Sequence, residues 1–333
     1  MTAERLDLSM ALSDNDRTRP IIDGLVGIEG MRLRTTVVHP SEMFWRQLKF
    51  ADFDVSEMSM SSLLIAASKG DYRWAAIPVF TSRMFFHTRA LIRTDRGIEK
   101  PQDLRGKKVA VPEYQQTSAI WSRGIFKDEF GVDPRDVEWF MERTPDMSHG
   151  GSTGFKPPEG VRFNQIPKST NIGEMLAKGE IDATLLYLTA TNLVDRSTID
   201  ISRVPTVKPL FPSALAEGHR YYAKTGIYPI NHTLVVRRDL LDKHPWIALN
   251  LYSGFLRAKD WGARRARELM DSWVETGAFG PDPETAFRAD PLAYGVKAAR
   301  PVLETIAKYL HEQGLTDRQV KLEEVFAKSV MDV

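Results

Sequence analysis

Short runs of β-branched and aromatic residues alternate along the chain with longer stretches of helical period. The runs expected to form strands are Leu6–Leu12, Met31–Val38, Phe53–Ser59, Trp74–Phe80, Lys107–Val111, Val137–Met141, Ile181–Leu188 and Tyr228–Val236. Helices are expected at Glu42–Lys49, Ser61–Lys69, Gln115–Phe130, Ile172–Lys178 and Pro301–Gln313, and from Pro245 onward with Leu249, Tyr252, Phe255 and Leu256 on one face. Strands that alternate with helices predict a mostly parallel α/β sheet, with ligands beyond the carboxyl ends of its strands.

Two passages predict that the chain forms two lobes. The polar stretch Gly97–Gly106 is typical of a crossing between lobes, and Tyr228–Val236 is the expected return strand. We therefore expect a discontinuous first lobe of residues 1–93 and 229–333, with residues 94–228 inserted as the second. The segment Glu142–Gly160 is too glycine-rich for regular structure, which predicts either a functional loop or a merely mobile one.

The turn after the strand Lys107–Val111 is a candidate carboxylate site. Pro112 ends the strand because proline cannot donate to a sheet ladder, and the next helix begins at Gln115 to Thr117. The first turn of a helix presents free backbone N–H groups and the positive end of the helix dipole. The alternative is an ordinary strand-to-helix turn.

Composition excludes several classes of protein. Lys and Arg together number 45 and Asp and Glu 44, so no basic excess indicates nucleic acid or an anionic membrane as a partner. The sequence has no cysteine, which rules out disulfides, thiolate metal sites and cysteine nucleophiles. Met1–Leu12 has no apolar h-region and the longest apolar runs are too short to span a bilayer, so we expect a cytoplasmic protein.

Several stretches carry a resemblance to a known family. They are Asp14–Thr18, Phe53–Ser59, Ile77–Phe80 with Ser82–Phe85, Val111–Gln115, Thr225–Ile230 with His232–Thr233, and His244–Trp246. In these the chain resembles the 4,5-dihydroxyphthalate decarboxylase family. The resemblance implies the type II periplasmic-binding-protein-like fold, in which two α/β lobes close on a ligand. Where the family usually has an arginine after the strand from Ile181, this sequence has Tyr187–Ala190, which indicates a divergent sister group.

The resemblance also implies a chemistry and a set of site residues. Decarboxylation of a hydroxyaryl acid needs a group that protonates the ipso carbon, and His232, Glu113 and His87 are the candidates. Arg83 and Arg17 are candidates to anchor a carboxylate through paired hydrogen bonds. The further candidates for substrate binding are Asp14, Ser59, Ser61, Tyr114, Gln115, Thr117, His149 and Tyr187.

Each candidate has a structural alternative. His232 would otherwise be a satisfied core histidine, Glu113 a carboxylate at a helix start, and either arginine a member of a surface ion pair. For the whole chain, the alternatives are a solute-binding protein of a transporter and a cytoplasmic sensor of a small organic acid. We expect an aromatic carboxylate as ligand and no required cofactor or metal, because no pair of these residues has a local ligand spacing. The sequence leaves open whether the protein forms a homo-oligomer.

Overall fold

The first of two sheets is built from both ends of the chain. The computed structural model describes residues 5–280, 282, 285 and 289–333, so residues 1–4, with which the expected first lobe begins, lie outside it. The strand order is β2-β1-β3-β11-β4, in which β1 is parallel to β2 and β3, and β11 is antiparallel to β3 and β4. Their bounds are β1 Leu6–Leu12, β2 Met31–Val37, β3 Val55–Ser59, β4 Trp74–Arg83 and β11 Ile230–Arg237.

The second sheet has the order β10-β5-β9-β6-β7-β8. Its strands are β5 Leu91–Arg93, β6 Lys108–Val111, β7 Glu138–Met141, β8 Arg162–Gln165, β9 Ala183–Thr184 and β10 Val207–Pro209. Since β5 pairs with β9 and β10, the second lobe begins before residue 93. The chain therefore crosses within the 3-10 turn Phe86–Arg89, earlier than the polar passage at which we expected the crossing.

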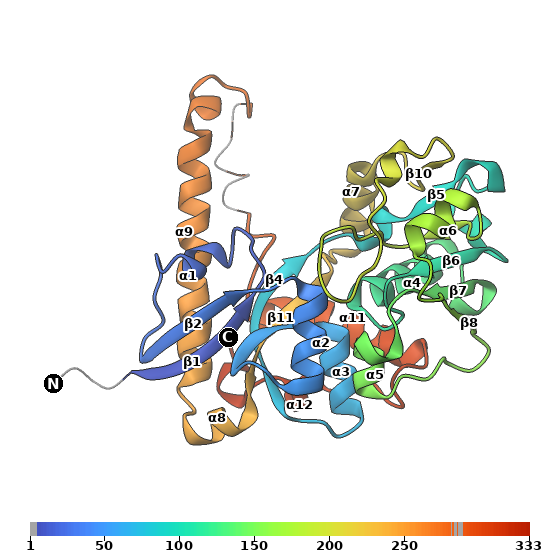
Figure 1. Ribbon diagram of the computed structural model, residues 1–333. Helices are drawn as coiled ribbons and strands as arrows, with labels where there is room; N and C mark the ends of the chain where they lie inside the picture. Colours follow the sequence, from blue (N-terminus) through green and yellow to red (C-terminus); the bar gives the residue numbers. More distant parts are fainter. Residues whose placement is uncertain (1–4, 281, 283–284, 286–288) are drawn as a thin grey trace.

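Helices cover the sheets and bridge the lobes (Figure 1). Their bounds are α1 Arg19–Ile22, α2 Pro40–Phe50, α3 Met60–Ser68, α4 Thr117–Phe130, α5 His149–Thr153, α6 Ile172–Lys178, α7 Ala214–Thr225, α8 Arg238–Lys243, α9 Ile247–Glu275, α11 Val296–Glu312 and α12 Leu322–Val325. In α4, Trp121 donates its indole N–H to the carbonyl of Ile230 on β11 at 2.9 Å. Gly124 lies so close to the Tyr309 ring of α11 that a Cβ there would sit 2.2 Å from it. The second lobe is thereby locked to the first along α4.

Three predicted elements differ in the structure. The segment Glu142–Gly160 contains α5, because the Ser148 hydroxyl caps the helix by accepting from the backbone N–H of Gly151. The expected strand Ile181–Leu188 shrinks to β9, after which the chain turns across the cavity described below. Helix α9 buries only part of the expected face: Phe255 is buried and Tyr252 and Leu256 pack against the core, whereas Leu249 is 43% exposed.

Candidate active site

A cavity of about 430 Å³ lies where the carboxyl ends of β3 and β4 meet the second lobe. Strand ends, the start of α2, the start of α4 and the segment after β9 all contribute to its wall. The lining residues are His39, Pro40, Ser41, Phe44, Ser59, Ser82, Met84, Phe86, Arg89, Leu91, Gln116, Thr117, Ser118, Arg143, His149, Leu186, Tyr187, Leu188, Asn231 and His232. Most of this wall is apolar, with a few polar groups, which suits an aromatic ligand.

His232 and the buried Glu57 form a hydrogen-bonded pair in the wall. On β11, His232 lies opposite Ser59 of β3 and Ser82 of β4, which directs it to the strand ends. His232 Nδ1 lies 3.1 Å from Glu57 Oε2, and Glu57 also accepts from Ser13 and Thr81 at 2.6 Å. Burial works to raise the pKa of Glu57, but the hydrogen bonds and charge of His232, with bonds from Ser13 and Thr81, outweigh it and lower that pKa. An ionised carboxylate therefore supports the imidazole from behind.

Asn231 lies next to His232 on the cavity wall. Its side-chain Nδ2 is 2.8 Å from His232 Nε2, so the second ring nitrogen of the histidine is also engaged. The Oδ1 atom of Asn231 is buried and has no hydrogen-bond partner among the described residues. A buried acceptor without a donor marks a place where a ligand can bind.

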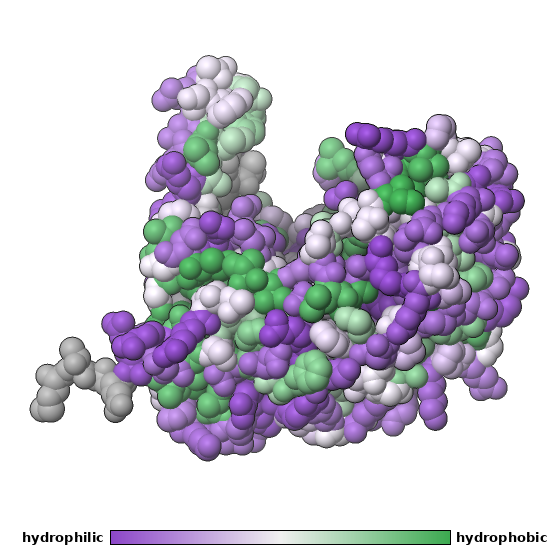
Figure 2. Space-filling view, viewed as in Figure 1, coloured by the Kyte–Doolittle hydropathy of each residue, from purple (hydrophilic) through white to green (hydrophobic). Residues whose placement is uncertain are grey.

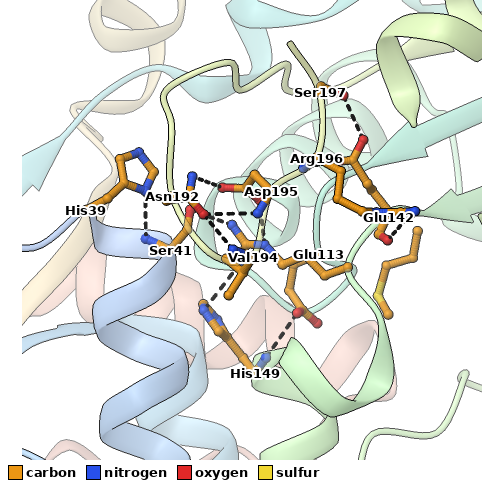
Figure 3. Close-up of polar contacts among 12 residues, drawn as sticks. His39, Ser41, Glu113, Glu142, His149, Asn192, Val194, Asp195, Arg196 and Ser197 are labelled. Carbon is orange, nitrogen blue, oxygen red and sulfur yellow. Dashed lines mark hydrogen bonds and ion pairs between the residues drawn. The ribbon is translucent and has the colours of Figure 1, made fainter. Parts of the chain in front are cut away.

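His149 contacts an arginine cluster on another wall. Arg143 forms a buried ion pair with Asp195 at 2.7 Å, donates to the Ser41 hydroxyl at 2.6 Å and approaches His149 Nε2 at 3.4 Å. Burial, together with the charge of Arg143, lowers the pKa of His149 to about 3, so its ring is neutral at ordinary pH. Figure 3 shows Asn192 and Asp195 on the loop that passes over Ser41 and His149. This cluster holds the loop in place over the site.

Glu113 supports His149 from behind the cavity wall. Its Oε2 accepts the backbone N–H of His149 at 3.1 Å, as Figure 3 shows, and its Oε1 is buried without a partner in the described part of the chain. Burial raises the pKa of Glu113 to about 7. Since Glu113 is not among the residues that line the cavity, this position favours the positioning of α5 over direct proton transfer to a ligand.

Arg89 is the exposed arginine of the cavity wall. It ends the 3-10 turn Phe86–Arg89 between the lobes, and it forms no ion pair or hydrogen bond with the residues that the structure describes. The other arginine of the wall, Arg143, is already neutralised by Asp195. Arg89 therefore brings an uncompensated positive charge to the site, suited to a carboxylate.

The start of α4 forms a third polar region, where the sequence predicted a carboxylate site. The Thr117 hydroxyl contacts those of Ser59 at 2.8 Å and Ser61 at 3.0 Å, which fixes the helix start to β3. Gln116, the N-cap residue, lines the cavity and is 7% exposed, and its Nε2 donor has no partner within the described residues. The Gln115 side chain instead turns away to Thr153 of α5. A helix start and an orphaned donor together suit an anionic oxygen.

The structure brings together some of the predicted residues and separates others. His232, His149, Ser59, Thr117 and Tyr187 line the cavity, while Ser61, Gln115 and Glu113 hold the lining residues in place. The Tyr187 hydroxyl donates to the carbonyl of Ile199 at 2.8 Å. Five candidates, Arg83, Arg17, Asp14, Tyr114 and His87, do not line the cavity.

The two predicted anchoring arginines satisfy backbone carbonyls instead. Arg83, which follows the cavity residue Ser82, turns the other way and donates to the carbonyl of Ala293 at 2.6 Å. Arg17 donates to the carbonyl of Thr81 at 2.7 Å, and Asp14 pairs with Arg19 at the surface. Residue alternation along β4 explains the placement of Arg83, because adjacent side chains point to opposite faces of a sheet.

Tyr114 and His87 belong to the core. Tyr114 is fully buried with the guanidinium of Arg123 3.8 Å above its ring. His87 is buried with Nε2 3.1 Å from Glu217, and burial lowers its pKa to about 4. Neither ring reaches the cavity wall.

The site residues that were missed in the sequence include Glu57, Arg89, Arg143 and Asn231. Glu57 could have been found, because a glutamate within the predicted strand Phe53–Ser59 is an unusual core residue and needs a partner there. The other three lie in turns or at a strand start, where periodicity is uninformative.

Two searches of the described residues found no further site type. They contain no group of three or more His, Cys, Asp or Glu placed to hold a metal ion. In the same part of the chain, no helix is both long and apolar enough to cross a membrane.

Solved structures with the same architecture confirm the predicted fold. The periplasmic aliphatic sulphonate-binding protein SsuA of Escherichia coli is 12% identical, with a TM-score of 0.52, and the alignment covers 96% of this chain and 91% of that one. The desulfurization enzyme DszB is 13% identical with a TM-score of 0.52 and 97% coverage of both chains. At these identities the likeness shows the two-lobed periplasmic-binding-protein-like fold alone.

Sequence relatives define the family, although no family model matches the chain. A 4,5-dihydroxyphthalate decarboxylase of Comamonas testosteroni is 33% identical over 325 residues, which are 97% of this chain and 96% of the relative. Another, of Pseudomonas putida, is 37% identical over 181 residues, covering 54% of this chain and 70% of that protein. The resemblance noted in the sequence is thus confirmed over almost the whole length. The chain belongs to the 4,5-dihydroxyphthalate decarboxylase family.

Proposed function

We propose that the protein is a carboxy-lyase that releases CO2 from a hydroxylated phthalate. The observation that carries this proposal is the 33% identity to a 4,5-dihydroxyphthalate decarboxylase over 97% of the chain. It is supported by a cavity of about 430 Å³ with an apolar wall, a histidine held by a carboxylate, and an arginine that has no partner among the described residues. The volume lies within the range of ordinary small-molecule sites.

His232 is the proton donor of the proposed reaction. An ionised ring hydroxyl pushes an electron pair through the ring to the carbon that carries the departing carboxylate, and this carbon takes a proton from the imidazolium of His232. The bond between that carbon and the carboxylate then breaks, its electron pair returns through the ring to restore the ionised hydroxyl, and CO2 leaves. Glu57 stabilises the imidazolium while it exists, through the contact at Nδ1. In the imidazolium Nε2 also carries a proton, so the Asn231 amide, whose Nδ2 lies 2.8 Å from Nε2, moves away from it for this step. Solvent then returns a proton to His232.

Arg89 anchors the carboxylate that is retained. An arginine without a partner can offer two parallel N–H donors to a carboxylate, which fixes the ring in the cavity. The departing carboxylate needs the opposite environment, because loss of its charge as CO2 is favoured where it has little stabilisation. Phe44 and Leu186 offer such an apolar wall.

Three further features belong to the same proposal. The reaction uses no organic cofactor and no tightly held metal, since the ring hydroxyl itself supplies the electron push. We propose a cytoplasmic location for the enzyme. Its ligand is a small aromatic carboxylate.

We also infer that the protein associates with a second copy of itself through α9. Beyond Ala258 the helix buries none of its described residues, and Figure 1 shows it projecting from the first lobe. Leu269 and Trp273 on this projection are 58% and 53% exposed. They continue the stripe of Leu251, Phe255 and Ala258, which packs on the body of the protein.

The test of the proposed reaction is CO2 release from purified protein. We expect 4,5-dihydroxyphthalate and 4-hydroxyphthalate to release CO2 and phthalate, which lacks the ring hydroxyl, to release none. Arg89→Gln is the matched variant, with Arg203→Gln as a control at an exposed arginine outside the cavity. Tight binding of these acids without CO2 release from any of them would instead support the solute-binding or sensor function.

A further inference from the structure

The directions of the hydrogen bonds around Glu57 are fixed by chemistry. Glu57 Oε1 accepts from both the backbone N–H and the hydroxyl of Ser13 at 2.6 Å, and Oε2 accepts from the Thr81 hydroxyl at 2.6 Å. An ionised carboxylate can only accept, so the contact from His232 at Oε2 must be a donated Nδ1–H. In the neutral imidazole the proton is thus held at Nδ1.

The same reasoning fixes the amide of Asn231. With the proton at Nδ1, His232 Nε2 carries a lone pair, so the group 2.8 Å away must be the Asn231 NH2. The Oδ1 of Asn231 therefore points the other way, where it is buried and has no donor among the described residues. An unpaired buried acceptor costs about 1–3 kcal/mol, which a ligand hydroxyl can recover.

The part of the cavity wall that belongs to the second lobe carries a buried donor without a partner among the described residues. Gln116 belongs to the second lobe, and its buried Nε2 is a donor without a partner in the described structure. It lies at the start of α4, where the helix dipole favours negative charge. A ligand that satisfies both walls must present a hydroxyl donor to β11 and an anionic oxygen to α4.

We propose that Asn231 Oδ1 accepts a hydrogen bond from a ring hydroxyl of the substrate, which still carries its proton when the substrate binds, while Gln116 Nε2 donates to one of the substrate carboxylates. This inference rests on the proposed function and adds the orientation of the ring and the residues that select a hydroxylated phthalate. A site built to pair with a hydroxyl discriminates strongly against the analogue that lacks it, because its own polar group is then left unpaired. Asn231 is thus a specificity-determining residue and Gln116 a binding residue.

The test measures dissociation constants by calorimetry for two probes, phthalate and 4-hydroxyphthalate. The wild type should bind the hydroxylated probe about tenfold more tightly, or about 1.4 kcal/mol. Asn231→Leu should remove that preference while leaving phthalate affinity within about threefold, and Asn231→Asp, which keeps an acceptor, should retain it. If the Leu variant does not fold, Asn231→Ala takes its place.

Gln116 is tested with the same probes. Gln116→Met keeps the shape but removes the donor, so both probes should weaken about equally, by about tenfold. An unchanged hydroxyl preference in Asn231→Leu, no preference in the wild type, or unchanged affinities in Gln116→Met would overturn the proposal. Because these readouts are affinities, they remain decisive if the wild type releases no CO2, in which case the proposed reaction alone fails.

Discussion

Glu57 gives His232 the properties of a proton-transfer residue. Three donors besides the histidine converge on this buried carboxylate, and together with His232 they lower its pKa although burial opposes them. A negative charge held next to Nδ1 stabilises the imidazolium that proton donation requires. The pair resembles other histidine–carboxylate arrangements in function, since the carboxylate fixes both the tautomer and the orientation of the ring.

Replacing His232 should separate chemistry from binding. We expect His232→Asn to lower kcat by about 10²-fold or more, because general acid catalysis by a positioned side chain contributes about 10²- to 10⁴-fold. The affinity for phthalate should change little. Turnover and calorimetric affinity are measured on one preparation. An unaltered kcat alongside a collapsed affinity would make His232 a binding residue only.

The arginines of the site give a second prediction at this scale. Arg89→Lys keeps the charge but loses the paired donors, so kcat/KM should fall by about tenfold or more. Arg83→Lys, the change that the sequence alone favoured, should leave kcat/KM within about twofold, since Arg83 donates to the Ala293 carbonyl outside the cavity. The reverse order of effects would return the anchoring role to Arg83.

The sequence predicted where the site lies better than it predicted which residues form it. Ser59 and His232 were found because they lie in family-like stretches, and Thr117 was found because it lies at the predicted start of a helix. Arg83 was chosen because it lies in the family-like stretch Ser82–Phe85, and no pattern indicates that the arginine of the cavity, Arg89, follows in the next turn. Arg143 and Asp195 are 52 residues apart, so their pairing is visible only after folding.

Among the elements, α5 depends most on contacts outside its own sequence. Five residues with two adjacent glycines do not form a stable helix alone, because glycine is a poor helix former. Ser148 caps it, and the Glu113 carboxylate accepts the N–H of His149 at its start. The glycine-rich composition therefore predicted an irregular loop, and tertiary contacts overrode it.

Glu113 makes the stability of the protein depend on pH. Burial raises its pKa from 4.5 to about 7, so the folded state holds this proton more tightly than the unfolded state. That contribution is fully present below the unfolded pKa and is lost as the pH rises through about 7. We expect the free energy of unfolding of the wild type to fall relative to Glu113→Gln by roughly 1–3 kcal/mol between pH about 5 and about 8.

Urea denaturation at a series of pH values measures this difference. The exposed Glu159→Gln serves as the control and should follow the wild type across the whole range. A constant difference between wild type and Glu113→Gln would mean that Glu113 does not take up a proton in this range.

The contact between α4 and α11 gives a prediction for a single helix position. Alanine normally favours a helix over glycine, but a Cβ at position 124 would lie 2.2 Å from the Tyr309 ring. Overpacking should outweigh propensity, so Gly124→Ala should lower the free energy of unfolding by about 1–3 kcal/mol. Gly27→Ala, where nothing lies within 4 Å, is the control. A higher free energy of unfolding for Gly124→Ala would show that Tyr309 of α11 shifts readily to make room for the methyl group.

At the scale of the whole molecule, the alternation of strands and helices predicted the α/β class, and the two crossing passages predicted the two lobes. The order of strands within each sheet was not predictable, because β11 enters the first sheet between β3 and β4 by contacts more than 140 residues apart in sequence. The first crossing was placed too late for a similar reason, since β5 is a three-residue strand that pairs only with β9 and β10. Short strands carry too little pattern to be assigned from sequence.

The projecting part of α9 exposes an apolar stripe, and a second copy of the chain would supply a surface for it to pack against. A single helix of about 17 residues is marginal in water, yet this one extends from the body with Leu269 and Trp273 exposed. Figure 2 shows hydrophobic residues beside hydrophilic ones on the projecting column. Its charges are also separated, with Arg264, Arg265 and Arg267 preceding Glu268, Asp271 and Glu275.

This charge order favours an antiparallel pair of α9 helices related by a two-fold axis. Each basic half then faces the acidic half of its partner, whereas a parallel pair would oppose like charges. The apolar stripe of both helices lies at the axis, with Gly262 and Ala266 allowing close approach.

Sedimentation velocity of three proteins tests the pairing. The wild type should sediment as a dimer, and Leu269→Glu should shift it to the monomer, whereas Leu215→Glu, at a 69% exposed leucine of α7, should not. A chain carrying Arg264→Glu, Arg265→Glu and Arg267→Glu, and one carrying Glu268→Lys, Asp271→Lys and Glu275→Lys, should each be monomeric alone, because their helices repel. Mixed together they should associate, since between residues 264 and 275 one helix then carries only acidic charges and the other only basic charges. A monomeric wild type at the highest attainable concentration, or a mixture that stays monomeric, would leave α9 without a role in self-association.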